Sequence, residues 1–214
     1  MVAPPHQRGR TRCSPPGSTT SVVRQFDEPR CGEVKWDNNH ERCHMPDKMN
    51  DPRDLFLHEL GDVLYAERTL VKTLPKLKKE ASDEELARGF EEHLTETKQH
   101  VLNVEQAFEA LGEKPKAEKC PGIEGIKQEH DEFVSNESPS PEVLNSFLTG
   151  AGARTEHYEI AAYEGLVTSA EAMGENEVVE LLSENLEQEL KALAKMKAIG
   201  KRLAKEGAKH DAAA

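Results

Sequence analysis

The chain has 214 residues, of which 32 % are charged and 5 % aromatic, with a mean hydropathy of −0.73 and a formal net charge of −12. No run of apolar residues approaches the ~18 that a membrane-spanning helix needs, so a transmembrane protein is excluded. The negative charge argues against non-specific binding to nucleic acid or to anionic membranes, and the length allows one domain, or one domain with a tail.

The cysteines do not form a disulfide framework. Cys13, Cys31 and Cys43 lie in the part of the chain least suited to folding, and Cys120 stands alone in the acidic part. No apolar segment of the kind found in a Sec-type signal peptide follows Met1. Both observations favour a reducing compartment, and we expect a cytoplasmic protein.

Residues 1–50 differ from the remainder in charge and composition. They carry 8 Lys and Arg against 6 Asp and Glu, whereas residues 51–214 carry 20 against 34. They also hold six of the twelve prolines and show neither helical nor strand periodicity. Such a segment cannot bury enough apolar surface to offset its chain entropy, so we expect a disordered N-terminal extension.

Three further interpretations of this extension compete. The first 26 residues have four arginines and no acid, as in an organellar transit peptide, although their prolines interrupt the required amphipathic helix. A zinc site is suggested by Cys31, His40, Cys43 and His44, but the paired C-x₂₋₄-C knuckle is missing. We favour an over-extended reading frame, in which the true start is Met45 or Met49, directly before the first expected helix.

The stretch from Asp51 to Ala81 has the pattern of an amphipathic helix. Its apolar residues recur at spacings of four, three, seven, four and three. They form one stripe facing a core: Phe56, Leu60, Val63, Leu70, Leu74 and Leu77. Asp51 and Pro52 are suited to a helix cap and a first-turn proline, and Pro75 should kink or shorten the last turns.

Residues 82–112 predict a second helix. Ser82 with Glu85 three residues later is a capping-box signature, and Gly112 is suited to the position that ends a helix. Residues 113–141 are rich in proline and are expected to form a long connection that includes a short helix, "IEGIKQEHDEFV".

Two more helices are predicted, over residues 141–174 and 176–206, followed by a frayed tail over residues 207–214. We therefore expect residues 51–206 to form an all-α, antiparallel four-helix bundle, with the long crossover between helices two and three.

Each expected helix carries acids or histidines on the stripe that should face the core. They are Glu67 on the first helix, Glu96 and His100 on the second, Glu156 and Glu159 on the third, and Glu189 on the fourth. A single such glutamate is ordinarily a boundary residue whose carboxylate reaches solvent. Because all of them fall near the middle of their helices, they should meet at one level, where a pair of divalent ions would relieve their repulsion.

Three stretches of the sequence resemble the YciE/YciF-type ferritin-like stress proteins. They are "LHELGDVLYAERTLVKTLPKL", "FEEHLTETKQHVLNVEQAFEALGEKPKAEKCPGIEGI" and "EHYEIAAYEGL". The resemblance covers residues 52–205 and leaves residues 1–48 outside. It implies a fold similar to rubrerythrin and ferritin, a homodimer, and a dimetal site holding two iron ions, or manganese.

Carried over residue by residue, the resemblance points to the same ligands. They are Glu67, Glu96 with His100, Glu159 assisted by Glu156, and Glu189. Better-known di-iron members have Glu-x-x-His on two helices, whereas here Ala192 and Leu193 stand where helix four could offer a second ligand. A site with one histidine and unequally held metals is expected, with His93 and His157 beside the ligands or at the boundary.

Two functions follow from the sequence. The first is a stress-response dimetal carboxylate protein that reacts with peroxide or dioxygen, and manganese-catalase-like activity would share the same ligands. The second is a non-enzymatic dimeric stress protein whose inward acids are vestigial or share protons. Storage of a mineral core is disfavoured, because nothing in the sequence marks a large cage assembly.

Overall fold

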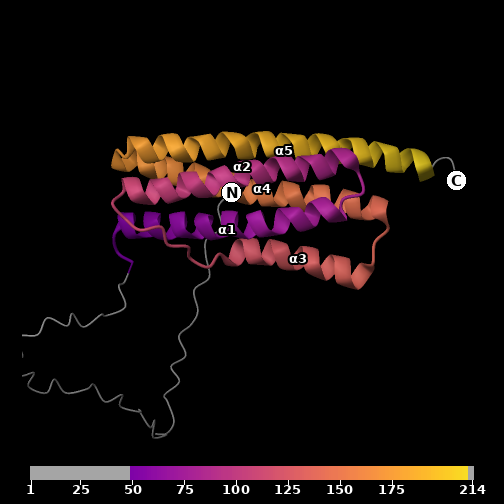
Figure 1. The fold of residues 1–214 in the computed structure, drawn as a ribbon, viewed down its shortest axis with the longest axis horizontal. Coiled ribbons are helices and arrows are strands. Elements are labelled where there is room, and N and C mark those ends of the chain that lie inside the picture. The colour runs from indigo at the N-terminus through magenta and orange to yellow at the C-terminus, as the bar shows by residue number, and fades with distance from the viewer. Residues whose placement is uncertain (1–48, 212–214) are drawn as a thin grey trace, which may run out of the picture. The chain divides into compact units, whose positions relative to one another are not determined.

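The computed structural model describes residues 49–211 of the chain, and side chains as far as residue 208. Within this range there are five helices and no strand (Figure 1). The helices are α1 (Pro52–Glu80), α2 (Glu84–Ala110), α3 (Pro121–Glu137), α4 (Pro141–Met173) and α5 (Asn176–Asp211). The prediction of an all-α fold is confirmed. The interpretations of residues 1–48 concern a segment that lies outside the described residues.

The helix ends follow capping rules, with one correction. Asp51 caps α1 by accepting a hydrogen bond from the Arg53 N–H, as the sequence predicts. The N-cap of α2 is Asp83 rather than Ser82, because the Asp83 carboxylate accepts from the Leu86 N–H at 2.9 Å. Ser82 is instead engaged by Asn145, which donates to its hydroxyl over 2.8 Å.

The structure gives the bounds of two helices in which the sequence predicts an interruption. Pro75 lies inside α1, which continues to Glu80, because the lost backbone hydrogen bond falls in the last turns while Leu74 and Leu77 remain packed in the core. The last helix continues to Asp211, past the point at residue 207 where the sequence predicts a frayed tail. The short helix expected within residues 113–141 is α3, which has 17 residues.

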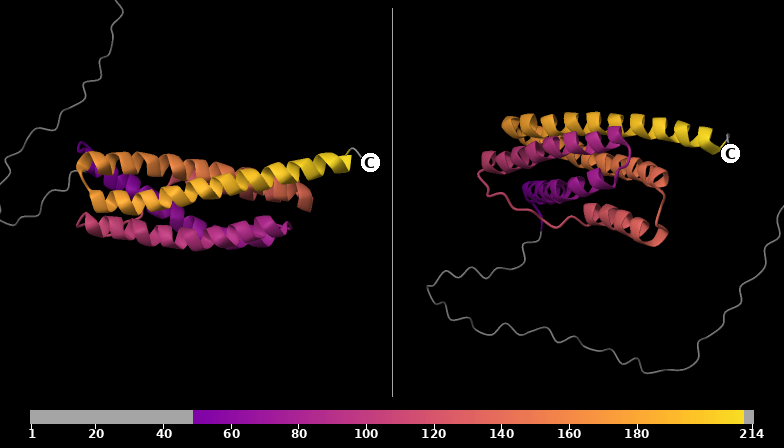
Figure 2. Two further views of the ribbon diagram at one scale, coloured as in Figure 1. Left: turned by 90° about the horizontal axis from the view of Figure 1, so that it is seen from above. Right: turned by 45° about the vertical axis from the view of Figure 1, so that its right-hand side comes forward.

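Four of the helices pack around a shared core (Figures 1 and 2). Going round this core, α1 packs against α2, α2 against α5, α5 against α4, and α4 against α1, while α3 packs against α4. The first turn of α3 packs closely against α4, because a Cβ on Gly122 would lie 2.6 Å from the ring of Tyr158. The segment before α3 is tied to α1 by a hydrogen bond of 2.9 Å from the Glu118 N–H to the Gly61 carbonyl.

The core consists of two apolar clusters, one towards each end of the four packed helices. One contains Phe56, Leu60, Phe108, Leu166 and Leu182, and the other contains Leu70, Leu74, Phe90, Leu148 and Met196. Residues of the first cluster precede Glu67 on α1, and most of the second follow it. The middle of the helices is therefore left to other side chains.

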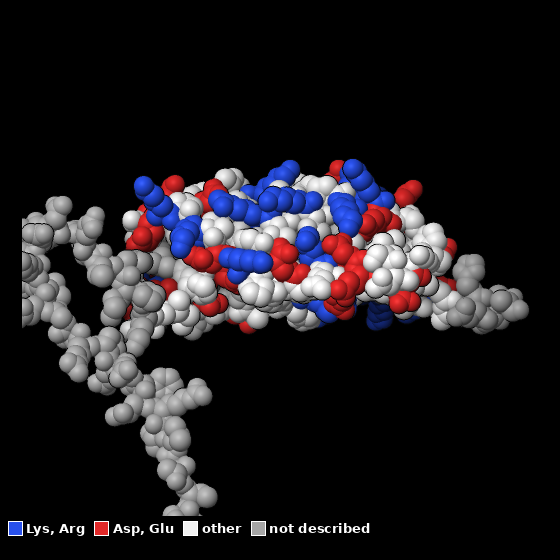
Figure 3. Space-filling model, turned by 90° about the horizontal axis from the view of Figure 1, so that it is seen from below, with Lys and Arg blue, Asp and Glu red and all other residues white. Residues whose placement is uncertain are grey.

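The surface carries both signs of charge. On the face seen in Figure 3, Lys and Arg side chains stand beside Asp and Glu side chains. Among the ion pairs between helices, one links α1 to α3, with Lys76 Nζ 2.8 Å from Asp131 Oδ1. Of the helices described, none is long and apolar enough to cross a membrane.

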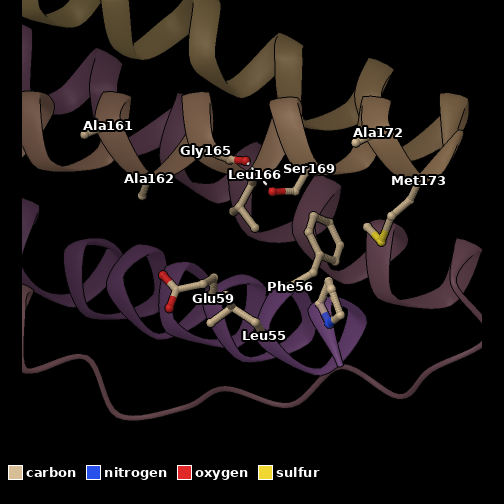
Figure 4. Close-up of a pocket in the computed structure, with 11 residues that line it drawn as sticks. Leu55, Phe56, Glu59, Ala161, Ala162, Gly165, Leu166, Ser169, Ala172 and Met173 are labelled. Carbon is tan, nitrogen blue, oxygen red and sulfur yellow. Dashed lines mark hydrogen bonds between the residues drawn. The ribbon is translucent and has the colours of Figure 1, made fainter. Parts of the chain in front are cut away.

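A surface groove of about 500 Å³ runs between α1 and α4 (Figure 4). Leu55, Phe56 and Glu59 line it from α1, and small residues such as Ala161 and Gly165 line it from α4. Its lining contains a single carboxylate and no histidine. The groove therefore offers an apolar surface rather than a set of metal ligands.

Candidate metal centre

Between the two apolar clusters lies a layer of buried polar side chains. It includes residues from all four core-forming helices: Glu67, His93, His100, Asn103, Glu156, Glu159, Tyr163, Asn185 and Glu189. The side chains of Glu67, His100 and Glu189 have no exposed surface at all. Charged groups are rarely buried so completely unless they are paired or bind an ion, so this layer requires a specific explanation.

The polar side chains gather into two groups that could each hold a metal ion. One consists of Glu67, His100 and Glu189, and the other of His93, Glu156, Glu159 and Glu189. In each group the potential ligand atoms, one from each residue, lie within 4.8 Å of one another. Glu189 belongs to both groups, so the two potential metal positions are adjacent and share one carboxylate.

Distances show how Glu189 is shared. Its Oε1 lies 2.9 Å from His100 Nδ1, and its Oε2 lies 3.8 Å from His93 Nε2. His100 Nδ1 also lies 3.3 Å from Glu67 Oε1, and His93 Nε2 lies 3.6 Å from Glu156 Oε1. The two oxygens of one carboxylate thus face two different imidazoles, as a bridging carboxylate between two metals would.

Most of these atoms lack a hydrogen bond. In the described part of the chain, eight buried side-chain atoms have no hydrogen-bond partner, and all eight belong to the two groups. They include both oxygens of Glu159 and of Glu189, together with His93 Nε2 and His100 Nδ1. The contact between His100 and Glu189 is short but does not have hydrogen-bond geometry. An unpaired buried polar group costs about 1–3 kcal/mol, so this arrangement favours a shared cation over pairwise hydrogen bonding.

The orientation of His100 is set from its far side. Its Nε2 lies 3.0 Å from Gln188 Oε1, and the amide nitrogen of Gln188 donates to Glu184. The Gln188 oxygen therefore faces the ring and accepts a hydrogen bond from Nε2–H. In a neutral imidazole this leaves the Nδ1 lone pair directed at Glu67 and Glu189, as a metal ligand requires.

The pKa values of the buried acids shift in two directions: three are raised and one is lowered. Burial, followed by the negative charge of neighbouring carboxylates, raises the pKa of Glu156 and of Glu159 well above the usual value. Burial also raises the pKa of Glu67. For Glu189 burial acts in the same direction, but the nearby carboxyl of Glu156 and the proximity of two histidines lower its pKa to about 2.

The pKa of His100 is raised, whereas that of its neighbour Glu189 is lowered. Burial alone would lower its pKa, but Glu189 and Glu67 outweigh burial and raise it to about 10. Without a metal at neutral pH, an ionised Glu189 therefore faces a protonated His100. A metal that binds here must displace that proton, because the imidazole is a ligand only when neutral.

A chain of donors supports Glu67. The Tyr163 hydroxyl donates to Glu67 Oε1 at 2.5 Å, and Asn185 donates to the Tyr163 oxygen at 2.9 Å. Asn103 in turn donates to Asn185 at 2.8 Å. From its sequence, Tyr163 is expected to be a core aromatic residue whose hydroxyl reaches a polar partner. Asn103 and Asn185 are not among the predicted site residues, although the position of Asn185 on the apolar stripe of its helix is a signal that could have found it.

The structure brings five of the six predicted ligands together: Glu67, His100, Glu156, Glu159 and Glu189. Glu96 is in neither group; its side chain is 41 % exposed, and its Oε2 lies 3.3 Å from His93 Nδ1. His93, expected beside the ligands, occupies the place that Glu96 was expected to take. His157 is exposed on α4. That these residues bind metal stays a prediction.

Helix geometry explains the exchange of His93 for Glu96. At about 100° per residue, positions seven apart differ by only ~20° around the helix, whereas positions four apart differ by ~40°. His93 therefore shares the face of His100 more closely than Glu96 does. Each group has one histidine, and both histidines come from α2. As expected, Ala192 and Leu193 of α5 are apolar and add no ligand.

The chain matches a family described as a domain of unknown function (DUF892) over residues 51–209. It is 37 % identical to Protein YciF of Escherichia coli (strain K12) over 142 residues, which are 66 % of this chain and 85 % of YciF. The crystal structure of the E. coli stress protein YciF has a TM-score of 0.70 with this chain at 34 % identity, covering 73 % of this chain and 99 % of that one.

A second solved structure is equally similar. YcfI of Rhodopseudomonas palustris, which is put forward as a structural protein, has a TM-score of 0.69 at 35 % identity, covering 72 % of this chain and 97 % of its own. The family match, the sequence identity and the shared fold agree, and the chain therefore belongs to the DUF892 family of YciF-type proteins.

Proposed function

We propose that this protein is a ferritin-like dimetal carboxylate protein of the stress response, which holds two divalent metal ions in the core of an antiparallel four-helix bundle. The observation that carries the proposal is the position of Glu189, whose two oxygens face the histidines of two adjacent groups. Glutamates with histidine in such a core are the ligand set of di-iron and di-manganese carboxylate proteins.

The donor set also fits the charge of two divalent ions. When ionised, the carboxylates of Glu67, Glu156, Glu159 and Glu189 supply four negative charges, which balance two divalent cations if both imidazoles are neutral. Carboxylate oxygens with one imidazole per metal are ligands that suit iron or manganese. Structural zinc sites, by contrast, are typically rich in thiolate ligands. We propose iron as the resident metal, with manganese as the alternative.

Bound redox-active metals would supply the chemistry for reaction with peroxide or dioxygen. The residues of the chain would provide the surroundings. The two apolar clusters exclude bulk water from the polar layer, and Tyr163 and Gln188 hold Glu67 and His100 in position. Glu156 and Glu159, whose pKa values are raised in the metal-free protein, would release their protons as metal binds.

A second candidate function is that of a non-enzymatic structural protein. It is favoured by the description of the R. palustris relative and by the internal compensation of charge in the metal-free core. There, the protonated His100 offsets Glu189, and the raised pKa values of Glu156 and Glu159 favour their neutral forms. In either case we propose that the protein is a homodimer, as the YciF-type resemblance implies, and that it lies in the cytoplasm, as its use of cysteine suggests.

Metal content separates the two functions. The purified protein is incubated anaerobically with Fe(II), or separately with Mn(II), desalted and analysed for metal, and we expect about two ions per chain. Glu189→Ala should abolish loading of both positions, because both groups lose a ligand. Glu59→Ala, which removes an exposed carboxylate on α1, is the matched control and should load normally. Absence of metal from the wild-type protein would eliminate the dimetal function.

Thermal unfolding gives an independent measure. A ligand that binds only the folded state at 100 times its Kd adds about 2.7 kcal/mol to the free energy of unfolding. For a domain of this size that corresponds to a rise in Tm of roughly 5–10 °C. The structural function predicts a Tm that does not respond to added metal.

A further inference from the structure

A small cavity between α2 and α5 is lined by His93, a member of one of the two metal groups. Its volume is about 70 Å³, which is room for roughly two water molecules at ~30 Å³ each. Gly89 of α2 and Ala192 of α5 contribute to its lining, and their small size leaves the space open. The cavity can admit an ion with part of its hydration shell but not a larger organic ligand.

His93 joins this cavity to the buried groups. Its ring lines the cavity, and its Nδ1 lies 3.3 Å from Glu96 Oε2. Its other nitrogen, Nε2, lies 3.6 Å from Glu156 Oε1 and has no hydrogen-bond partner among the described residues. The imidazole is only 5 % exposed, so one ring separates a partly exposed carboxylate from the buried ones.

The charges around the cavity single out Glu96. Two lysines and one further glutamate also line the cavity, and they are engaged with other residues or with each other: Lys195 pairs with Glu92, and Lys191 lies 3.6 Å from Glu187 Oε2. Glu96 contacts His93 instead of a lysine. It is therefore the cavity carboxylate best placed to attract a cation and to direct it towards the histidine.

The wide groove between α1 and α4 lacks this connection. None of the residues lining it belongs to either metal group, and its one carboxylate, Glu59, is exposed on the surface of α1. On the other side of the polar layer, Glu67 and His100 have no exposed side-chain surface. Of these routes, the cavity at His93 is the one that leads to a potential ligand.

We propose that this cavity is the access route for hydrated divalent cations, with Glu96 as the first, transient ligand and His93 as the group that passes the ion to the buried carboxylates. This inference rests on the proposed dimetal function and concerns the rate at which metal reaches the centre. It accounts for Glu96, which lies outside both metal groups but is in contact with a member of one.

The test is the rate of Mn²⁺ uptake by the full chain, followed by the loss of the electron paramagnetic resonance signal of free Mn²⁺, with the final metal content measured after desalting. Glu96→Gln removes the attracting charge, and Ala192→Leu fills the cavity. We expect each to slow uptake about tenfold or more while the final content stays at the wild-type level. The matched controls are Glu180→Gln and Ala194→Leu, which change exposed positions on α5 outside the cavity lining.

The outcomes distinguish this inference from the function on which it rests. Wild-type uptake rates in both Glu96→Gln and Ala192→Leu would overturn the access route and leave the dimetal function intact. Loss of one metal equivalent in Glu96→Gln would also overturn it, because Glu96 would then be a permanent ligand. If the wild-type protein takes up no metal, the dimetal function fails and the access route fails with it. Because Glu96 is partly exposed, its variant remains informative even if Ala192→Leu does not fold.

Discussion

The Tyr163 hydroxyl donates a hydrogen bond of 2.5 Å to Glu67, and it is the last member of a chain of donors that all point the same way. The exposed Gln99 donates to Asn103, Asn103 to Asn185, and Asn185 to the Tyr163 oxygen. Side-chain amides are poor carriers of protons, so this chain directs positive dipole ends at the Glu67 carboxylate. It favours the ionised form of Glu67 against the effect of burial.

Removal of the Tyr163 hydroxyl should destabilise the metal-free protein. Tyr163→Phe removes a hydrogen bond to a buried carboxylate and leaves the Asn185 amide with the His100 carbonyl, 3.3 Å away, as its remaining acceptor. We expect a loss of about 1.5–3 kcal/mol in the free energy of unfolding, measured by urea denaturation. Tyr65→Phe is the control, because the Tyr65 hydroxyl donates to the partly exposed Glu124 and its loss should cost less than about 1 kcal/mol. Equal losses in the two variants would contradict a special role for Tyr163.

Glu159 should stabilise the metal-bound protein and destabilise the metal-free one. Neither of its oxygens has a hydrogen-bond partner in the described structure, and burial raises its pKa well above the usual value. A carboxyl whose pKa is raised by folding binds more protons in the folded state, so the metal-free protein loses stability as pH rises above the pKa of the unfolded chain.

Glu159→Met removes the buried carboxyl, and with it the loss of stability as the pH rises. In the metal-free protein we expect a gain of about 1–3 kcal/mol at neutral pH and a flatter dependence of stability on pH, together with weaker metal binding. Glu164→Met, at an exposed position of the same helix, should change stability by less than about 0.5 kcal/mol. A Glu159→Met variant that is less stable than the wild type without metal would show that the carboxyl is well accommodated.

Metal affinity should increase with pH. Binding requires a neutral His100, whose pKa is about 10, and ionised Glu156 and Glu159, whose pKa values are raised. Glu189, with a pKa of about 2, is already ionised and releases nothing. Each proton displaced adds about tenfold in affinity per pH unit.

Titration calorimetry in two buffers with different ionisation enthalpies counts the protons released. At neutral pH we expect at least one proton per chain, from His100, and further protons from Glu156 and Glu159, because their raised pKa values favour the protonated form in the metal-free protein. Affinity that is constant between about pH 6 and pH 8 would be inconsistent with ligation by His100.

The contact between α3 and α4 should be sensitive to one methyl group. A Cβ on Gly122 would lie 2.6 Å from the Tyr158 ring, whose hydroxyl is fixed by a 2.9 Å hydrogen bond to Asp62 and a 2.9 Å contact with Cys120. Because the ring cannot move without breaking these contacts, Gly122→Ala should cost about 1–3 kcal/mol in unfolding free energy.

Gly125, one turn further along α3, provides the comparison. A Cβ there meets nothing within 4 Å, so Gly125→Ala should stabilise the protein by about 0.5–1 kcal/mol through helix propensity. Denaturant titrations of the two variants should therefore shift in opposite directions. A shift in the same direction would show that the close packing at Gly122 is readily relieved.

Much of this fold is predictable because the helices carry a regular apolar stripe. The spacing of Phe56, Leu60 and Val63 predicts the first helix, and Asp51 and Gly174 mark helix ends through local backbone chemistry. The true cap of α2 was missed because Ser82 and Asp83 are both good caps, and the choice depends on Asn145, which is distant in sequence. A contact between residues so far apart in the sequence cannot be predicted from local sequence patterns.

The candidate site was predictable for a similar reason and within similar limits. Glu67, Glu159 and Glu189 interrupt apolar stripes, so their inward direction follows from helical period alone. His93 and Glu96 lie 60° apart on an ideal helix, and which of them faces the core depends on the rotation of α2 against α5. That rotation is decided by packing across helices, as is the closeness of Tyr163 to Glu67.

The sharing of Glu189 also has a consequence for biosynthesis. Glu189 lies on the last helix of the chain, so a nascent polypeptide that has already exposed Glu67, His100 and Glu159 still lacks the carboxylate common to both groups. The ligands that emerge early are separated from it by 30 to 122 residues and can meet it only once α5 has docked. Metal capture at both positions would then have to follow the docking of α5.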